Sequence, residues 1–404
     1  MLKVNFLCLL VQCLAFLWSS SATFLPADED AKKNTSELIA SKGYPVEEHT
    51  VTTKDSYVIW IQRIPTGRAT AVGSPRGQKK PVVFLMTGLH GTSADYVANM
   101  PDQSPGFILA DHGFDVWLGN VRGTKYSSHL RLSKKDKAFW DFSFDEMIES
   151  DLPAQIDAIL LKTQQEALLY VGWSQGTLIM FGLLASKPEY NNKVLLFNAL
   201  APVAFLGHIT AKIRLALPIA DTITKMLQFL LRGAAFAKKN IAIDATKKLS
   251  CGRIRSGKLC HAGFYFINGG FPIEMNQTRL PVYLAFEPTG TSVRNWNHFA
   301  QIVKSNRFQK YDWGRARNIA IYGKPWPPQY DLGKVTAPVA LYWSDGDVLA
   351  TPRDVAHVAR SLPNVVLNYK VPVPGFTHVD FGWTIRGKDH VYKKMLEMII
   401  RYSP

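Results

Sequence analysis

The stretch LLYVGWSQGTLIMFGLLASKP, residues 168–188, contains the clearest indication of the fold. A β-type apolar run drops into Gly172-Trp173-Ser174-Gln175-Gly176, and a second apolar run of helical character follows. A strand, a sharp turn and a helix around a G-x-S-x-G motif predict an elbow that exposes the serine oxygen at the carboxyl edge of a sheet. A structural turn with an idle serine is the alternative. The flanking strand and helix favour the elbow.

Short apolar runs alternate with helical patterns along the chain, which predicts an α/β protein with a mostly parallel sheet flanked by helices. The expected strands are 82–86, 115–118, 168–171, 194–198, 339–343 and 365–371, after an antiparallel strand at 57–65. The expected helices include 145–161, 177–187 and the C-terminal segment 391–402. From 205 to 281 the alternation stops, and an apolar, basic sequence predicts an inserted helical cap. The expected division is an N-terminal leader (1–22), a first part of the α/β core (23–204), the inserted helical cap (205–281) and a second part of the core (282–404).

The N-terminal segment MLKVNFLCLLVQCLAFLWSSSATF has an early lysine, an apolar run and small residues at its end. This pattern predicts a signal peptide over residues 1–22, cleaved after Ala22. An uncleaved anchor is the alternative, although the apolar run is short for a membrane span. We therefore expect a secreted or lysosomal protein without a transmembrane helix.

Cysteine usage agrees with that compartment. Two of the four cysteines lie inside the leader, which leaves Cys251 and Cys260. In an oxidising compartment we expect these two to form one disulfide that closes a short loop. A zinc site is disfavoured because no second pair of ligands accompanies them. Asn34 and Asn276 begin N-x-S/T triplets and are expected glycosylation sites.

The 404 residues carry a formal net charge of +15, and the charge is uneven. Residues 207–260 hold eleven lysines and arginines and two aspartates, a net charge of +9. No nucleic-acid recognition motif accompanies this charge, so we expect no nucleic-acid partner. Attraction of the cap to anionic lipid surfaces and a merely solvated basic face both remain open. The sequence leaves the oligomeric state unknown.

A serine nucleophile needs a base, and on this fold the chain order is Ser, Asp, His. Three histidines lie late enough in the chain. His357 and His390 fall in helical patterns that face solvent, whereas His378 falls in the Pro/Gly loop VPVPGFTHVDFGW after a strand. His378 is therefore the expected base for Ser174.

The acid and the oxyanion donors are also expected at strand ends. The segment VALYWSDGDVLATP offers Asp345 and Asp347, and spacing alone does not separate them. Two backbone N–H groups should bind the oxyanion, one from Gln175 and one from Leu89 in the glycine-rich loop TGLHGTSADY. The alternative is that this loop is only a tight turn.

Larger blocks of this sequence resemble the acid lipases, the family of lysosomal acid lipase and gastric lipase. The resemblance runs from about Gly43 to the C-terminus. It includes GYPVEEHTVTTKDSYVIWIQRIPTGR, SPGFILADHGFDVWLGNVRGTKYS, FWDFSFDEMIESDLPAQIDAIL, GTSVRNWNHFAQIVKSNRFQKYDWG and PPQYDLGKVTAPVALYWSDGDVLATPRDV. The blocks in this order are far more specific than the serine motif.

The resemblance implies an α/β-hydrolase core with a helical cap and lid that acts on water-insoluble acyl esters. It matches Ser174 to the nucleophile, His378 to the base and Asp347, rather than Asp345, to the acid. It also matches Leu89 and Gln175 to the oxyanion donors. The cysteine pair matches a disulfide of gastric-type members.

Two positions depart from the family pattern. Family members usually carry His-Gly in the oxyanion loop and Gly-His-Ser-Gln-Gly at the elbow, whereas this chain has Thr87-Gly88 and Trp173. Neither change removes a member of the triad or an N–H donor. Both remove an imidazole near the nucleophile, so an acidic pH optimum is not assured.

The sequence therefore predicts a secreted or lysosomal lipase that hydrolyses triacylglycerols or steryl esters through Ser174, Asp347 and His378, without a metal or other cofactor. A catalytically weak or inactive lipase-like protein that binds lipid or anionic surfaces is the alternative from another class. A soluble short-chain esterase is a third possibility. The choice between triacylglycerols and steryl esters, and between secretion and lysosomal delivery, stays open.

Overall fold

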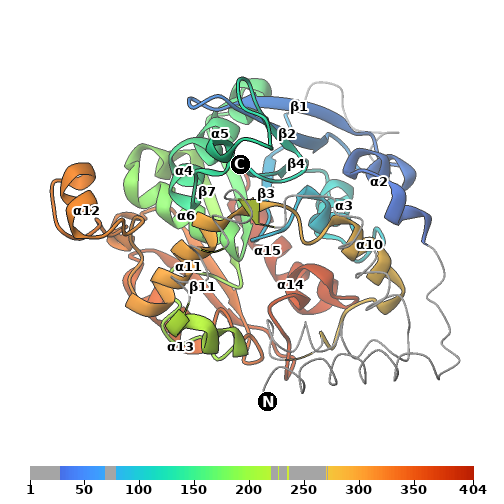
Figure 1. The fold of residues 1–404 in the computed structure, drawn as a ribbon. Helices are drawn as coiled ribbons and strands as arrows, with labels where there is room; N and C mark the ends of the chain where they lie inside the picture. The colour runs from blue at the N-terminus through green and yellow to red at the C-terminus, as the bar shows by residue number, and fades with distance from the viewer. Residues whose placement is uncertain (1–27, 69–78, 220–225, 227–233, 236–269, 271) are drawn as a thin grey trace, which may run out of the picture.

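The computed structural model of the protein describes residues 28–68, 79–219, 226, 234–235, 270 and 272–404. Its centre is a nine-stranded sheet with the order β1-β2-β4-β3-β6-β7-β10-β11, and β5 pairs with β2 (Figure 1). The strands are β1 (Glu47–Thr52), β2 (Tyr57–Ile64), β3 (Val82–Met86), β4 (Asp115–Gly119), β5 (Ser127–His129), β6 (Leu168–Trp173), β7 (Val194–Leu200), β10 (Val339–Trp343) and β11 (Val365–Lys370).

Strand pairing follows the hydrophobic pattern of the sequence. Every residue of β3, β4 and β6 is buried, as expected for continuous apolar runs that are covered on both faces of a sheet. All pairs from β4 to β11 along the sheet are parallel, whereas β1–β2 and β2–β4 are antiparallel. The expected mostly parallel sheet, with an antiparallel strand before it in the chain, is confirmed.

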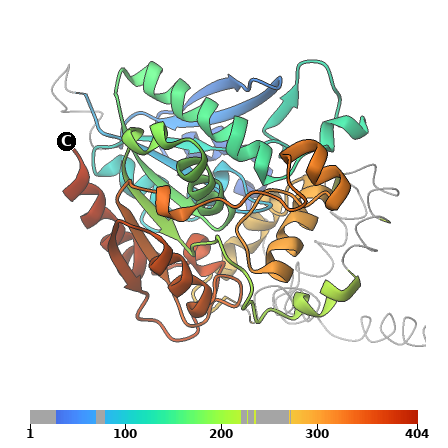
Figure 2. The ribbon, with the colours of Figure 1, turned by 90° about the vertical axis from the view of Figure 1, so that its left-hand side faces the viewer.

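Helices cover the sheet on both faces. In Figure 2 the green helix α5 and the red helix α15 lie on opposite sides of the strands. The helices are α2 (Thr35–Ser41), α3 (Pro105–Asp111), α4 (Phe144–Glu146), α5 (Leu152–Thr163), α6 (Gln175–Ser186), α10 (Leu280–Phe286), α11 (Val293–Ser305), α12 (Arg315–Tyr322), α13 (Pro352–Ser361), α14 (Asp380–Trp383) and α15 (Lys393–Tyr402).

Shorter helical turns connect these elements. The 3₁₀ helices are η1 (Glu29–Lys32), η3 (Ser93–Tyr96), η4 (Lys137–Trp140), η6 (Pro188–Lys193), η7 (Lys212–Ile219), η8 (Gln277–Arg279) and η9 (Leu332–Lys334). The π-helical turns are η5 (Met147–Asp151) and η10 (Lys388–Tyr392). The helix expected over 145–161 is therefore α4, η5 and α5 in succession. None of the described helices is long and apolar enough to cross a membrane.

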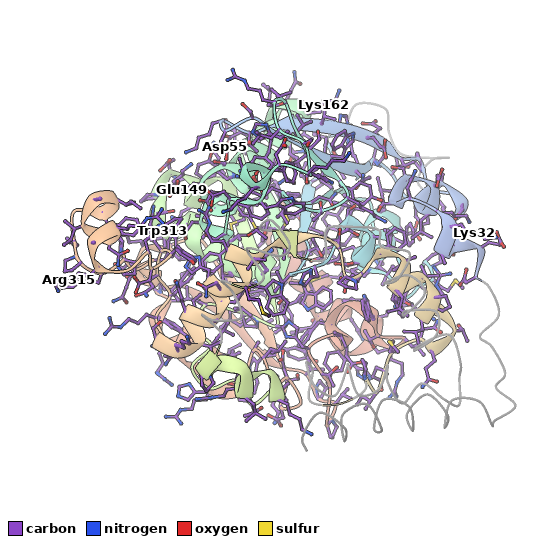
Figure 3. All side chains as sticks on the ribbon, in the orientation of Figure 1. Lys32, Asp55, Glu149, Lys162, Trp313 and Arg315 are labelled. Carbon is purple, nitrogen blue, oxygen red and sulfur yellow. The ribbon has the colours of Figure 1, made fainter. Side chains whose placement is uncertain are left out.

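Helix α12 projects from the body of the protein at the left of Figure 1. Trp313 and Arg315, labelled in Figure 3, lie where the chain enters this helix. The Trp313 ring carries the guanidinium groups of Arg317, 4.3 Å from its centroid, and Arg294, 4.9 Å away. Cation–π contacts of this kind hold the base of the projection against the body.

The inserted segment expected over residues 205–281 lies only partly within the described residues. Its described elements include η7, η8 and the short strand β8 (Ala234–Ala235), which pairs with β9 (Thr291–Ser292). A strand there differs from the expectation of helices alone. Its partner β9 lies beyond the insertion in the sequence, so the pattern within the insertion does not reveal the pairing. The expected boundary at 281 falls inside α10. The leader, residues 1–22, and the pair Cys251 and Cys260 lie outside the described residues.

Candidate active site

Parallel strands bring the expected site residues to one edge of the sheet. The carboxyl ends of β3, β6, β10 and β11 lead into the loops that carry Leu89, Ser174, Asp347 and His378. In open α/β sheets this edge is where ligands bind. The order of the strands, rather than closeness in the sequence, therefore assembles the candidate site.

Ser174 occupies a strained turn between β6 and α6. Its backbone has φ 54° and ψ −116°, a conformation that residues with a Cβ rarely adopt. Its N–H donates to the carbonyl of Leu200 at 3.0 Å, which fixes the turn against β7. A Cβ on Gly172 would lie 2.8 Å from the Gly176 carbonyl carbon, and one on Gly176 would collide with the Met86 carbonyl oxygen. The two glycines let α6 begin directly against the ends of β3 and β6.

His378 and Asp347 are in direct contact. The His378 Nδ1–H donates to Asp347 Oδ2 at 2.7 Å, and both side chains are buried. The other carboxylate oxygen, Oδ1, accepts the backbone N–H groups of Leu349 at 2.9 Å and Ala350 at 2.8 Å. Asp345 instead forms an ion pair with Lys370 on the surface. Of the two aspartates that spacing left open, only Asp347 contacts His378.

Gly346, between the two aspartates, allows the acid loop and the histidine loop to pack together. A Cβ at this position would lie 2.5 Å from the Gly375 carbonyl carbon and 2.7 Å from the Phe376 carbonyl oxygen. The histidine loop is braced from its other side by Asp380, which accepts the Thr377 N–H at 2.7 Å and its hydroxyl at 2.8 Å. Both loops are thus held by close backbone contacts.

Trp173, the residue before Ser174, joins the elbow to the histidine loop. Its indole N–H donates to the His378 carbonyl oxygen at 3.1 Å, and the two ring centroids are 6.2 Å apart. The ring packs on Gly382, where a Cβ would lie 2.8 Å from indole Cζ3. No hydrogen bond links the Ser174 hydroxyl to the His378 ring among the described residues. Such bonds often tighten only when substrate binds.

The glycine-rich loop of residues 87–91, here called the oxyanion loop, lies against Ser174. A Cβ on Gly88 would lie 3.3 Å from the Ser174 Cβ and 3.8 Å from its Oγ. The backbone N–H groups of Leu89 and Gln175 have no acceptor among the described residues. The Gln175 side chain is turned into the protein, where its Oε1 accepts the Asn295 amide at 2.8 Å. The two expected oxyanion donors therefore flank the elbow.

His90 anchors the oxyanion loop from behind, a contact that no sequence motif indicated. Its Nε2 accepts the Trp296 indole N–H at 2.9 Å, and its Nδ1–H donates to the Thr289 carbonyl at 2.6 Å. The Thr289 N–H donates back to the His90 carbonyl at 2.8 Å. Burial lowers the pKa of His90 to about 4, so the ring is neutral at physiological pH. Its partners lie about two hundred residues away, which explains why local patterns could not reveal them.

The two glycosylation triplets start at helix caps. Asn34 is exposed and caps α2, where its side chain accepts the Glu37 N–H at 2.9 Å. Asn276 is partly buried and caps η8, with its Oδ1 accepting the Thr278 N–H at 3.2 Å. In the described part of the chain, no group of three or more His, Cys, Asp or Glu side chains could hold a metal ion.

A strained serine elbow at the carboxyl edge of a mostly parallel sheet defines the class of α/β-hydrolases. A sequence profile described as "alpha/beta hydrolase fold" matches residues 81–383, and one described as "Partial alpha/beta-hydrolase lipase region" matches residues 35–100. The crystal structure of a membrane phospholipase A, a bacterial virulence factor, has the same fold, with a TM-score of 0.53 at 16% identity over 99% of this chain and 98% of that one.

Relatives found by sequence similarity identify the family to which the chain belongs within this class. It is 38% identical to the gastric triacylglycerol lipase of Bos taurus over 92% of each chain. It is 37% identical to lipase member K of Homo sapiens over 93% of each chain. The chain belongs to the acid lipase family of α/β-hydrolases, and the resemblance seen in the sequence is confirmed.

Proposed function

We propose that this protein is a secreted or lysosomal lipase that hydrolyses the carboxylic esters of neutral lipids, triacylglycerols or steryl esters, at an oil–water or membrane interface. One observation carries the proposal: a buried His378–Asp347 hydrogen bond lies beside the Ser174 elbow. Membership of the acid lipase family supports ester hydrolysis, and the name of the bovine relative supports a triacylglycerol substrate. The predicted leader and the N-x-S/T triplets support the compartment.

Each side chain has a defined task in this mechanism. The Ser174 Oγ attacks the ester carbonyl carbon while His378 Nε2 accepts its proton. Asp347 holds the His378 ring in the tautomer with Nδ1–H and stabilises the imidazolium that forms. The two N–H donors on Asp347 Oδ1 fix this carboxylate in orientation.

The tetrahedral intermediate places negative charge on the former carbonyl oxygen. The N–H groups of Leu89 and Gln175 point their dipoles at that oxygen, and one such donor is worth about 10²–10³ in kcat. The ester C–O bond then breaks, and His378 returns the proton to the leaving alcohol. A water molecule, deprotonated by His378, hydrolyses the acyl-enzyme and regenerates Ser174.

A covalent probe tests the proposal at its first step. A fluorophosphonate should label the wild-type protein at Ser174 and should leave a folded Ser174→Ala variant unlabelled. A panel of a short-chain ester, triolein and cholesteryl oleate, run from pH 4 to 8, then defines the substrate. Folded protein that resists the probe and hydrolyses none of the esters would refute the enzyme and favour a lipid-binding protein. Hydrolysis of the short-chain ester without activation at an oil–water interface would favour a soluble esterase.

A further inference from the structure

Helix α11 contacts both segments that carry the proposed oxyanion donors. Asn295 Nδ2 donates to the side-chain Oε1 of Gln175 at 2.8 Å. The next residue, Trp296, donates its indole N–H to His90 Nε2 at 2.9 Å. Gln175 carries one of the two donor N–H groups, and His90 directly follows Leu89, which carries the other. Two consecutive residues of one helix thus bind on both sides of the oxyanion site.

The hydrogen bond between Asn295 and Gln175 is shut off from solvent. Asn295 is fully buried, and Gln175 is 1% exposed. Asn295 Nδ2 also donates to the Thr291 hydroxyl at 3.2 Å, whereas Gln175 Oε1 accepts only from Asn295 in the described part of the chain. A buried acceptor that loses its donor is costly, because water does not replace the donor. The bond therefore holds the Gln175 side chain in one orientation.

The peptide that carries the Gln175 N–H is held by α6 at one end only. This peptide joins Ser174 to Gln175, and its carbonyl oxygen accepts the Thr177 N–H at 2.8 Å and the Thr177 hydroxyl at 2.6 Å. The Ser174 side chain makes no capping hydrogen bond to the first turn of α6. The Gln175 end of the peptide is fastened from outside the helix, by Asn295. Loss of Asn295 should therefore let this peptide tilt and move its N–H.

The Leu89 N–H is held from the same segment of the chain through His90. The His90 backbone has φ 66°, a left-handed conformation that costs free energy and persists only where surrounding contacts impose it. These contacts are the hydrogen bonds of the His90 ring and backbone to Thr289 and the bond of the ring to Trp296. Residues 289–296 lead through β9 into α11, so one segment fixes the turn that follows Leu89.

The first turn of α11 is itself tied to the core. Ser292 caps the helix by accepting the Asn295 N–H at 2.9 Å, and its hydroxyl donates to the Phe142 carbonyl. The Arg294 guanidinium forms an ion pair with Glu146 in α4. Ser292 is fully buried and Arg294 nearly so. This turn is therefore a fixed reference for the elbow and for the oxyanion loop.

We propose that Asn295 and Trp296 are positioning residues that set the spacing between the N–H groups of Gln175 and Leu89, so that both reach the same oxyanion. This inference rests on the proposed ester hydrolysis. The two donors follow different strands, β6 and β3, and they can bind one oxygen atom only while the two segments keep a fixed separation. Hydrogen bonds weaken steeply when a donor moves out of line, so the separation affects the transition state directly.

The variant Asn295→Leu tests the contact with Gln175. It removes the donor to Gln175 Oε1 and keeps a side chain of similar size. We expect kcat for a soluble short-chain ester to fall about 10- to 100-fold, because a misplacement on the order of 1 Å costs about 10² in rate. KM should stay within about threefold, because the donors act on charge that develops only in the transition state.

A trifluoromethyl ketone gives a readout that a merely structural role would not move. The Ser174 Oγ adds to its carbonyl carbon, the serine proton passes to His378, and the carbonyl oxygen becomes an oxyanion. Its inhibition constant should rise by the same factor by which kcat/KM falls in Asn295→Leu. A general loss of stability would leave this constant unchanged in folded protein.

A double-mutant cycle tests whether Asn295 acts through Gln175. Gln175→Met changes the side chain and leaves the backbone N–H in place. It should lower kcat about as much as Asn295→Leu does, and Asn295→Leu should cost less than about threefold more in the Gln175→Met background. Losses that multiply in the double variant would show that the two residues act independently, and the proposal would be overturned for Asn295.

The variant Trp296→Phe tests the contact with His90 separately. It keeps an aromatic ring and removes the N–H that His90 Nε2 accepts. We expect kcat to fall about tenfold with KM little changed. This variant decides the proposal if Asn295→Leu does not fold, and a wild-type kcat in Trp296→Phe would overturn the role of Trp296.

Asn318→Leu is the matched control. Asn318 is an equally buried asparagine whose side chain makes three hydrogen bonds, with Trp313, Asp312 and Pro325. It lies in α12, which projects from the body of the protein (Figure 1). Both Asn→Leu variants should lower the free energy of unfolding in urea, but Asn318→Leu should keep kcat within about twofold of the wild type, because distant sites act independently.

The outcomes separate the positioning role from the proposed function. A wild-type kcat and inhibition constant in folded Asn295→Leu would overturn the proposal, and so would an equal loss of kcat in Asn318→Leu. A wild-type protein that hydrolyses no ester and does not bind the ketone would refute the lipase function and the positioning role together. An active wild type with unaffected variants would refute the positioning role alone.

Discussion

The two neighbouring aspartates of the SDGD segment allow a sharp test of the site. Asp347 accepts the His378 Nδ1–H at 2.7 Å, whereas Asp345 pairs with Lys370 and more than half of its side chain is exposed. Asp347→Asn replaces the facing oxygen with an amide. The remaining oxygen can still accept the Leu349 and Ala350 N–H groups.

An amide N–H that faces Nδ1 forces His378 into the tautomer with its proton on Nε2. That nitrogen then cannot accept the Ser174 proton. We expect kcat to fall by about 10⁴, as wrong-tautomer variants of serine triads do, which is about 5.4 kcal/mol of transition-state stabilisation. The free energy of unfolding should change by only about 1 kcal/mol, because a neutral hydrogen bond replaces the charged one.

Steady-state turnover of a soluble ester, together with urea unfolding, measures both quantities. Asp345→Asn is the matched control, because an exposed ion pair contributes about 0–1 kcal/mol. It should leave kcat within about twofold of the wild type. A kcat for Asp347→Asn within tenfold of the wild type in folded protein would show that the Asp347–His378 contact does not set the tautomer of the histidine.

Two further substitutions probe the surroundings of the triad. Trp173→His should retain turnover but shift its pH profile, because it places a second imidazole beside His378. The ring centroids of Trp173 and His378 are 6.2 Å apart in the wild type. A variant profile that overlays that of the wild type would exclude this role for the position. Gly346→Ala should lower the free energy of unfolding by about 1–3 kcal/mol, measured in urea, and should lower kcat. The added Cβ would lie 2.5 Å from the Gly375 carbonyl carbon and would push the acid loop away from the histidine loop. A variant with wild-type activity and stability would contradict this close packing.

The elements of the fold could be read from the sequence because their causes are local. Buried parallel strands are continuous apolar runs, and all six of the strands expected from 82 to 371 match observed strands within a few residues. The elbow could also be predicted from the sequence, because a strained turn between strand and helix needs glycines at fixed spacing around Ser174. The prediction of His378 as the base followed by elimination of the other late histidines, because His378 lies in a Pro/Gly loop and has the expected place in the chain order.

Other features depend on which segments the fold brings together. Spacing could not separate Asp345 from Asp347, since both follow the same strand; family resemblance favoured Asp347, and the contact with His378 shows which one faces the histidine loop. The Trp173 hydrogen bond to the His378 carbonyl likewise crosses the chain from β6 to the loop after β11.

The α/β order of the elements, the serine turn and the family could all be predicted from the amino-acid sequence alone, because they rest on local propensity and on motifs. Only the tertiary structure placed Asn295 beside Gln175 and His90 beside Trp296 and Thr289. Each of these pairings joins residues at least 120 positions apart. A buried charge or hydrogen bond depends on the partner that packing supplies, and no local pattern encodes that partner.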